Sequence, residues 1–412
     1  MANVTALFYM IGVKMKDLSL YIHIPFCVKK CNYCDFLSAS CEEETRQRYV
    51  DALCQEIKQQ SEMFQDRNVD TVFFGGGTPS ILSSGQIGQI MSAVRKGFRI
   101  LTDAEITLEM NPGTVDKQKL ETYKKLGINR LSIGLQSANN EELKVLGRIH
   151  TWEEFLQTWE MVREAGFLNV NIDLMSALPG QTPESYEETL RKVLTLKPKH
   201  ISAYSLIVEE GTPFYEWFGE NGKRQRELPD EITDRKMYEL TKRMLEERGY
   251  YRYEISNYAL KGYECKHNIG YWKRKEYLGL GLGAASLISN IRCTNVTDLK
   301  KYLIIAEKKF IDEKKETPLE RWKSQEVVTE VTELSLEDQM EEFMFLGLRM
   351  MEGVSTAEFE NCFGKTLSEV YGEAITKLEK QGLLKYSKEN RRYVLTAQGI
   401  DISNQVFVEF LF

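Results

Sequence analysis

The chain has 412 residues, of which 42% are hydrophobic and 28% charged, so it can bury a substantial core and is long enough for more than one domain. Lys and Arg number 54 against 61 Asp and Glu, a formal net charge of −7, which argues against nucleic acid as the main ligand. No run approaches the roughly 18 apolar residues of a spanning helix, and the apolar stretch 6–13 has its lysines after it, the reverse of a secretory leader. We expect a cytoplasmic protein.

Short β-rich runs recur in the first half of the chain, with helical patterns between them. They cover residues 18–24, 69–76, 105–111, 130–137, 170–177 and 200–207. Apolar residues at helical spacing fill 45–64 and 151–167, and Gly166 is suited to ending the second helix. Strands that alternate with helices predict an α/β fold with a parallel sheet, whose ligands gather at the carboxyl ends of the strands. Six units are fewer than the eight of a closed barrel, so we predict a partial (β/α)6 barrel of the TIM type.

Changes in this pattern divide the chain into four parts. We assign 1–16 to an N-terminal tail, 17–250 to the core barrel, 251–330 to a linking segment, and 331–412 to a C-terminal helical, winged-helix-like module. Within the module, the sequence LLKYSKENRRYVL predicts a hairpin that turns at 388–390. Met15 closely precedes the first strand, so Met1 and Met15 are both candidate start residues.

Three of the eight cysteines stand together as C-x3-C-x2-C, directly after the first expected strand. They are Cys27, Cys31 and Cys34, in the sequence HIPFCVKKCNYCDF. Three thiolates on one loop can hold three irons of a [4Fe-4S] cluster and leave the fourth iron open for a small molecule. A structural zinc site is the alternative, but it would need a fourth ligand such as Cys41 or His23. The spacing favours the iron–sulfur cluster.

A glycine-rich stretch, GGGTPS at 75–80, ends the second expected strand. Alone it is equally typical of a tight turn, since glycine permits close backbone approach in either case. Read beside the three cysteines, it resembles the amino-acid-binding strand end of radical S-adenosylmethionine (SAM) enzymes. The resemblance to that superfamily extends over about residues 17–210.

Several longer motifs narrow this resemblance. YIHIPFC, GGGTPS, LEMNP, LSIGLQS, LGRIH, DLMSALPGQT, SAYSL and GTPF occur in order, and together they resemble the oxygen-independent coproporphyrinogen III oxidase family and the related HemW family of heme chaperones. The resemblance implies a SAM site formed by Tyr21, Tyr33, Gly76, Gly77, Thr78, Glu109, Gln136, Arg148 and Asp173. The carboxylates can accept hydrogen bonds from ribose hydroxyls or the amino group, and an arginine can pair with a carboxylate. Without the family, an Asp or Glu near a strand end equally suits a loop cap, Arg148 a surface ion pair, and Thr78 with the two glycines only the turn.

Three features favour the HemW branch. The oxidases resemble C-x3-C-x2-C-x-C, whereas Phe36 stands here at the fourth cysteine position, and only 26 residues precede Cys27. The chain also contains HNxxYW as 267–272, which resembles a HemW signature. The resemblance implies that His267, Tyr271 and Trp272 help to hold heme, since imidazole can ligate its iron and aromatic rings can pack on a porphyrin.

The physical evidence for a heme site in this segment is weaker than the resemblance. A histidine beside a tryptophan is more commonly a packing residue, and Cys265 fits either a core position or a second ligand. The stretch YLGLGLGAAS (277–286) is not followed by the strand–turn–helix unit and acidic residue of a dinucleotide site, so we expect close backbone packing there. The acidic sequence EDQMEEF argues against DNA binding by the C-terminal module, which we expect to cover the open barrel.

The resemblance implies a heme chaperone that binds a [4Fe-4S] cluster, SAM and heme, and delivers heme to client hemoproteins such as respiratory proteins at the membrane. Anaerobic decarboxylation of coproporphyrinogen III is the first alternative, supported by the barrel and opposed by Phe36. A radical SAM enzyme acting on a substrate other than a porphyrin is the second. Self-association as a homodimer stays open.

Overall fold

The computed structural model describes residues 16–308 and 317–412. The expected N-terminal tail, with both candidate start residues, therefore lies outside the described residues, except that Lys16 already belongs to the first strand. Part of the charged segment before residue 328 also lies outside them. Within the described ranges, no helix is long and apolar enough to cross a membrane.

The six expected strands are present and form a parallel sheet in chain order, which confirms the predicted α/β core. They are β1 (Lys16–Ile24), β2 (Arg67–Gly76), β3 (Arg99–Met110), β4 (Arg130–Gln136), β5 (Asn169–Ser176) and β6 (His200–Ser205). Their side chains alternate in environment, as strand geometry requires. In β1, for example, Leu18, Leu20 and Ile22 are completely buried in the main hydrophobic core, whereas Ser19 and Tyr21 belong to the opposite face of the sheet.

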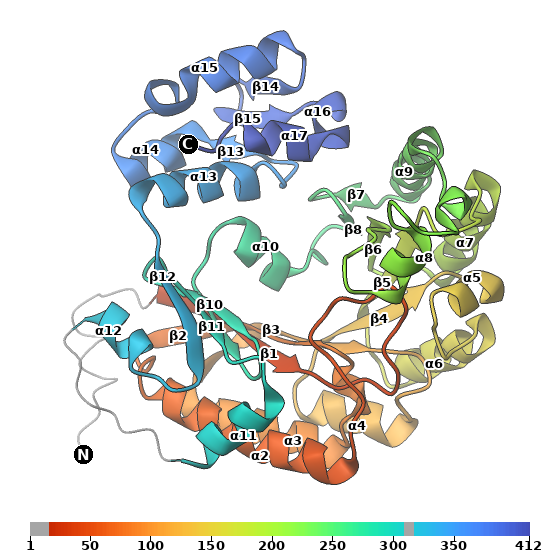
Figure 1. The fold of residues 1–412 in the computed structure, drawn as a ribbon, viewed down its shortest axis with the longest axis vertical. Helices are drawn as coiled ribbons and strands as arrows, with labels where there is room; N and C mark the ends of the chain where they lie inside the picture. Colours follow the sequence, from red (N-terminus) through yellow and green to blue (C-terminus); the bar gives the residue numbers. More distant parts are fainter. Residues whose placement is uncertain (1–15, 309–316) are drawn as a thin grey trace.

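Helices follow the strands in the chain. They are α2 (Glu43–Ser61), α3 (Ser84–Gly97), α4 (Lys117–Lys125), α5 (Asn140–Val145), α6 (Trp152–Glu164), α7 (Pro183–Leu196), α8 (Pro213–Phe218) and α9 (Glu231–Glu246), with short 3-10 turns η1 (Pro79–Ile81) and η2 (Gln225–Glu227). Of these helices, α2, α3, α4, α6, α7 and α9 pack their apolar side chains against one face of this sheet (Figure 1). Their starts are encoded locally: Ser83 with Gln86, and Thr151 with Glu154, form reciprocal capping boxes at α3 and α6. Gly166 follows α6 with a positive φ of 76° and ends it as expected.

The opposite face of the sheet is the inside of the partial barrel, and it is unusually polar. Its side chains, at every second strand position, include Thr71, Glu105, Thr107, Glu109, Arg130, Ser132, Asn171, Asp173, His200 and Ser202. Buried polar groups are costly unless they are paired or contact a ligand. This polar lining distinguishes the interior from the apolar core beneath the helices.

The segment 251–330, expected to be a linker, instead adds strands to both edges of the main sheet. Within the described ranges this sheet has twelve strands in the order β12-β11-β10-β9-β1-β2-β3-β4-β5-β6-β8-β7. The added strands are β7 (Tyr251–Arg252), β8 (Asn257–Ala259), β9 (Tyr277–Leu280), β10 (Ala285–Ile288), β11 (Ile291–Asn295) and β12 (Val328–Glu333). Helices α10 (Lys266–Trp272), α11 (Leu299–Glu307) and α12 (Pro318–Lys323) lie between them in the chain. These strands are two to six residues long, so their sequence pattern is weak.

The glycine-rich stretch 277–286 belongs to this extension. Strand β9 pairs in parallel with β1 and antiparallel with β10, so the stretch is sheet and not a phosphate-binding loop. The backbone N–H of Gly281 donates to the buried carboxylate of Glu56, which also accepts from Asn295 and Tyr302. These hydrogen bonds connect the added strands to α2. They agree with the close backbone packing expected for residues 277–286.

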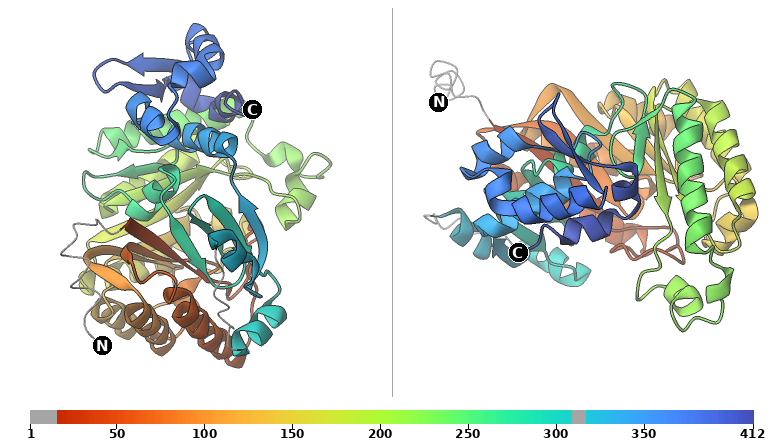
Figure 2. Two further views of the ribbon diagram at one scale, coloured as in Figure 1. Left: turned by 90° about the vertical axis from the view of Figure 1, so that its left-hand side faces the viewer. Right: turned by 90° about the horizontal axis from the view of Figure 1, so that it is seen from above.

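The C-terminal module has a separate hydrophobic core and a three-stranded sheet in the order β13-β15-β14. Its elements are α13 (Leu336–Gly347), β13 (Val354–Ser355), α14 (Thr356–Phe363), α15 (Leu367–Lys380), β14 (Leu384–Ser387), β15 (Arg392–Leu395), α16 (Ala397–Asp401) and α17 (Ser403–Val408). Ser387 pairs with Arg392, so the predicted hairpin turns through 388–391. The module lies beyond α10, on the side of the sheet away from α2 and α3 (Figures 1 and 2). Part of its acidic stretch makes the contact: buried Glu342 pairs with Arg274 and Arg292, each at 2.8 Å.

Candidate functional site

The three cysteines of the motif lie on the loop between β1 and α2, at the carboxyl end of the sheet. All three are partly exposed and free. The loop is held at its base, where the N–H of Cys27 donates to Ala39 O at 3.1 Å. It is held at its tip by Asn32, whose N–H donates to Leu146 O and whose side chain donates to Val145 O, both at 3.0 Å. The thiols are therefore presented on a backbone that α5 fixes from one side.

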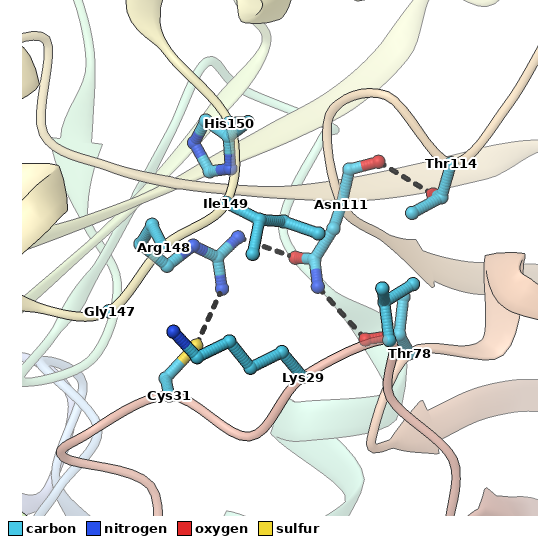
Figure 3. A pocket seen from close by; sticks show the side chains of 10 residues that line it. Lys29, Cys31, Thr78, Asn111, Thr114, Gly147, Arg148, Ile149 and His150 are labelled. Atoms are coloured by element: carbon cyan, nitrogen blue, oxygen red, sulfur yellow. Dashed lines mark hydrogen bonds between the residues drawn. The ribbon is translucent and has the colours of Figure 1, made fainter. Parts of the chain in front are cut away.

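Two side chains from outside the cysteine loop donate hydrogen bonds to these thiols, and Figure 3 shows the one from Arg148 to Cys31. The hydroxyl of Thr78, after β2, donates to Cys27 Sγ at 3.4 Å. The guanidinium of Arg148, after α5, donates to Cys31 Sγ at 3.6 Å. It also donates to Asn111 Oδ1 at 2.7 Å. Charge-assisted donors of this kind stabilise a sulfur that carries negative charge.

The glycine-rich stretch after β2 lies directly against the cysteine loop. The N–H of Gly77 donates to Ile24 O at 2.9 Å, and a Cβ on Gly77 would lie only 2.6 Å from Phe26 O. Gly76 has a φ of 108°, and a Cβ there would meet the ring of His23 at 2.5 Å. Only glycine permits this approach. The sequence GGGT is therefore needed to bring β2 beside the cysteines.

Two carboxylates project inward from β3 and β5, the strands on either side of β4. Glu109 lies near the end of β3, and Asp173 in β5 accepts from Ser132 at 3.2 Å and from Asn171 at 2.7 Å. Burial, and then the charge of Asp173, raise the pKa of Glu109 to about 8. Burial also raises the pKa of Asp173. Acidic groups kept this far from solvent are typical of ligand sites.

Three further residues of the predicted SAM site lie in the barrel interior, at the end of β4 and on the cysteine loop. Tyr21 lies inside the barrel, with its hydroxyl 3.0 Å from His23 Nδ1, and burial together with Glu109 raises its pKa. Gln136 ends β4 with a φ of 74°, which is strained for a residue other than glycine. Tyr33 belongs to the cysteine loop, where its ring packs edge-on against Phe214 of α8 and its hydroxyl is hydrogen-bonded to Arg148.

The residues around the cysteine loop fit a [4Fe-4S] cluster. Each thiolate of a cubane cluster binds a different iron, so the thiols need not converge on one point. A single ion would require convergence, and among the described residues no three His, Cys, Asp or Glu side chains are grouped to hold one. His23, a candidate fourth zinc ligand, has both ring nitrogens in hydrogen bonds, to Tyr21 and to Leu37 O. In this arrangement His23 is not free to act as the fourth ligand of a zinc ion.

The strand ends around the loop likewise fit an amino-acid-bearing cofactor such as SAM. Arg148 and the backbone beside Gly77 lie next to the cysteines, and the two buried carboxylates lie farther along the same inner face. A sulfonium compound with an amino group and ribose hydroxyls offers donors and positive charge to these acids. The structure brings the predicted residues together at this end of the sheet, and Tyr33 joins them through its hydrogen bond to Arg148.

The helix α10 carries the predicted heme residues, and its histidine is fully engaged within the protein. His267 is 2% exposed, with Nδ1 at 2.8 Å from Thr71 Oγ1 and Nε2 at 3.0 Å from Tyr271 Oη. Its ring stacks on Phe73 with centroids 5.0 Å apart. Burial lowers its pKa to about 3, so the imidazole is neutral. In this arrangement His267 joins α10 to β2.

Trp272, at the end of α10, faces the C-terminal module. The guanidinium of Arg349 lies over its ring, 4.3 Å from the centroid, and approaches Glu254 at 3.7 Å. Glu254 is completely buried, and burial raises its pKa. Cys265 is also buried, and its thiol donates to Glu105 at 3.5 Å. The HNxxYW segment therefore connects the barrel interior to the module.

Three residues of the site were not predicted from the sequence. Asn111 bridges Arg148 and Thr78, Asn32 anchors the cysteine loop, and Arg130 is a buried guanidinium on the inner face near Asp173. Asn111 and Asn32 lie within the motifs LEMNP and CNYC, so the motifs could have identified them. Arg130 opens a β-rich run, where its period-2 position relative to Ser132 was the available signal.

Comparison with known proteins agrees with this geometry. The radical SAM superfamily profile matches residues 21–193, and the HemN C-terminal domain profile matches residues 334–402. The coproporphyrinogen III oxidase HemN of Escherichia coli, described as a radical SAM enzyme, superposes with a TM-score of 0.80 over 99% of this chain and 93% of that one, at 25% identity. This likeness confirms the predicted fold class, a parallel-sheet core with a C-terminal module.

Curated relatives of similar length share the name heme chaperone HemW. The protein of Lactococcus lactis subsp. lactis (strain IL1403) is 37% identical over 96% of this chain and 98% of its own length. That of Bacillus subtilis (strain 168) is 36% identical over 95% and 99%. With a radical SAM core, a HemN-type C-terminal domain and these relatives along nearly its whole length, the chain belongs to the HemW family of radical SAM proteins.

Proposed function

We propose that this protein is a heme chaperone that binds a [4Fe-4S] cluster, SAM and heme, and transfers heme to client hemoproteins. The observation that carries the proposal is the assembly at the carboxyl end of the sheet. There, three cysteines, the GGGT turn and Arg148 meet in a chain whose relatives are named heme chaperones. The clients we propose are respiratory hemoproteins at the membrane, reached from the cytoplasm.

In this proposal Cys27, Cys31 and Cys34 bind the cluster. SAM lies between it and the inner face of β1 to β5. The SAM ligands are Tyr21, Tyr33, Gly76, Gly77, Thr78, Glu109, Gln136, Arg148 and Asp173. A reduced cluster can supply an electron to SAM when both are bound. The chain's contribution is to orient the ligand by hydrogen bonds and to exclude water around the buried carboxylates.

Heme is the cargo, and we propose that α10 takes part in holding it through His267, Tyr271 and Trp272. Two observations constrain this role. The ring nitrogens of His267 already bond to Thr71 and Tyr271, and Arg349 covers one face of Trp272. Heme binding at α10 therefore requires these contacts to open, and the C-terminal module, which contacts α10, is the part of the chain that would move.

Oxidative decarboxylation of coproporphyrinogen III is the rival function, favoured by the structural likeness to HemN. Phe36 at the fourth cysteine position opposes it, and its side chain is 64% exposed beside the cluster loop. The discriminating experiment is anaerobic: the reconstituted protein receives SAM, a reductant and coproporphyrinogen III, and tetrapyrrole mass is followed. We expect no change in mass. Loss of two carboxyl groups would establish the oxidase and refute the chaperone proposal.

Heme transfer is tested separately, with the full chain loaded with hemin. We expect faster transfer to an apo respiratory cytochrome than to apomyoglobin, an acceptor that only traps released heme. Equal rates to both acceptors, set by spontaneous release, would show that the protein is a passive heme binder. Trp272→Ala is the matched variant, and it should lower hemin uptake without changing the iron content of the cluster.

A further inference from the structure

Four hydrogen bonds join two of the three motif cysteines through the side chains of Thr78 after β2, Asn111 after β3 and Arg148 after α5. Figure 3 shows the three bonds that connect Cys31, Arg148, Asn111 and Thr78. Arg148 donates to Cys31 Sγ at 3.6 Å and to Asn111 Oδ1 at 2.7 Å. Asn111 Nδ2 donates to Thr78 Oγ1 at 2.9 Å, and the Thr78 hydroxyl donates to Cys27 Sγ at 3.4 Å. We call this set the thiol relay. Asn111 is its central member and touches neither sulfur.

The direction of every bond in the thiol relay follows from one fact: a guanidinium has only donors. Arg148 must therefore meet the oxygen of the Asn111 amide, which turns the amide nitrogen toward Thr78. Because Thr78 accepts from that nitrogen, its own proton is free to point at Cys27. The orientation of one amide thus fixes a donor on each of two sulfurs.

Asn111 is well suited to hold this orientation because its backbone is fixed. Its N–H donates to Ser80 Oγ at 3.4 Å, and its carbonyl accepts from Thr114 Oγ1 at 2.6 Å. Ser80 and Thr114 are in turn bonded to each other at 2.6 Å. Asn111 directly follows β3 and precedes Pro112, so the chain turns here at the end of a strand. These backbone bonds fix the position from which the Asn111 side chain reaches Arg148 and Thr78.

We propose that Asn111 is a positioning residue that sets the reduction potential of the cluster. It acts by directing donors at the sulfurs of Cys27 and Cys31, while Cys34 lies outside the relay. Hydrogen bonds to cluster sulfurs stabilise the reduced, more negatively charged form and so raise the potential. The inference rests on the proposed cluster, and it adds a residue that neither ligates the cluster nor belongs to the predicted SAM site.

The test is a reductive titration of the reconstituted full-length protein without SAM, followed by the electron paramagnetic resonance signal of the reduced cluster. Asn111→Asp keeps an acceptor for Arg148 but offers Thr78 a carboxylate, which draws the hydroxyl proton away from Cys27. We expect the ratio of reduced to oxidised cluster at a fixed ambient potential to fall three- to tenfold. A tenfold fall corresponds to about 59 mV for one electron.

Thr78→Val and Thr114→Val form the matched pair, because both replace a hydroxyl bonded to Asn111 by a methyl group. Only Thr78 lies in the thiol relay, so Thr78→Val should lower the ratio. Thr114→Val should leave it unchanged, because the bonds of Asn111 to Ser80 and Arg148 remain. In the double variant Asn111→Asp/Thr78→Val, the ratio should equal that of Thr78→Val alone, because both changes remove the same donor. An undiminished additional fall would show that the new charge acts directly, and would overturn the proposal.

Failure of this inference is distinct from failure of the proposed function. A wild-type protein that takes up no cluster would contradict the proposed cofactor. A wild-type cluster with the same potential in Asn111→Asp would contradict only the thiol relay. If Asn111→Asp assembles no cluster, the reduction potentials of Thr78→Val and Thr78→Ser are compared instead. Serine retains the hydroxyl donor, so we expect the higher potential in Thr78→Ser. Equal potentials in these two variants would also overturn the proposal.

Discussion

The cysteine loop and helix α10 lie at two ends of the same barrel interior, and they treat their polar groups in opposite ways. Around the loop, Thr78 and Arg148 direct donors at thiols that are partly exposed and otherwise free. In α10, His267 bonds to Thr71 and Tyr271 and is almost completely buried. The thiols of the cysteine loop are accessible to a ligand, whereas the hydrogen bonds of His267 are already made within the protein.

This difference shows what a sequence motif can and cannot tell. C-x3-C-x2-C and HNxxYW both resemble family motifs, yet the thiols of the first are partly exposed whereas the histidine of the second is buried and hydrogen-bonded within the protein. A buried polar group whose hydrogen bonds are complete stabilises the fold, and a ligand must displace those bonds to reach it. The HNxxYW segment therefore has a structural role, in which His267 joins α10 to β2.

The largest expected effect concerns the cysteine loop itself. Cys31→Ser should abolish the cluster, because it removes one of three thiolates, and iron content with the charge-transfer absorption of the reconstituted protein will measure this. Cys41→Ser is the control, since Cys41 lies on the same loop but outside the motif. Loss of metal in Cys41→Ser, with zinc in the wild type, would instead support the structural zinc alternative.

The second prediction concerns the joint between α10 and the C-terminal module. Arg349→Leu leaves the buried carboxylate of Glu254 without its cation and removes the contact with Trp272. We expect a loss of about 2–3 kcal/mol in the free energy of unfolding, less than for a fully buried pair because Arg349 is partly exposed. Glu254→Gln combined with Arg349→Leu should recover part of the loss in denaturant unfolding. An unchanged midpoint in Arg349→Leu would mean that the module is held by other contacts.

The sequence predicts the central fold well because the strands β1 to β6 are long and their environments differ sharply on the two faces. Alternation of buried leucines with polar residues, and capping boxes such as Thr151 with Glu154, are local signals. The edge strands from 251 to 333 could not be predicted, because two to six residues carry little periodicity. Their pairing depends on contacts distant in sequence, such as β9 with β1.

At the candidate site, the sequence predicts which residues meet but not how they bond to one another. Parallel strands end at one edge, so Gly76, Glu109 and Gln136 had to lie close together once the strands were identified. The role of Asn111 follows only from the position of Arg148, 37 residues away. The sequence could not predict the buried position of His267 either, because the hydrogen bond that holds it there comes from Thr71, 196 residues away.

The third prediction concerns the pH dependence of SAM binding near Glu109. The charged and titratable groups facing Glu109 are Asp173, Arg130, Tyr21 and Tyr271. Because its pKa is raised to about 8, Glu109 is protonated below that pH and accepts fewer hydrogen bonds, so SAM affinity should fall toward tenfold per pH unit below 8. Asp173→Asn should move the midpoint to lower pH, since it removes a repelling charge.

Calorimetric titration of SAM between pH 6 and 9 measures this dependence. Glu109→Gln is the control, because the titration of the ligand's own amino group persists in it while that of the carboxyl is lost. A wild-type profile identical to that of Glu109→Gln would remove this carboxyl from the SAM site.

The smallest expected effect tests whether His267 in α10 can also bind heme. If His267 ligates heme iron, each hydrogen bond that now holds its ring competes with the metal. Thr71→Val and Tyr271→Phe remove one competitor each, worth about 1 kcal/mol, and should tighten hemin binding about fivefold. His267→Ala should abolish the Soret shift. Because a purely structural histidine predicts no tightening in Thr71→Val, unchanged hemin affinity in this variant would confine His267 to joining α10 to β2.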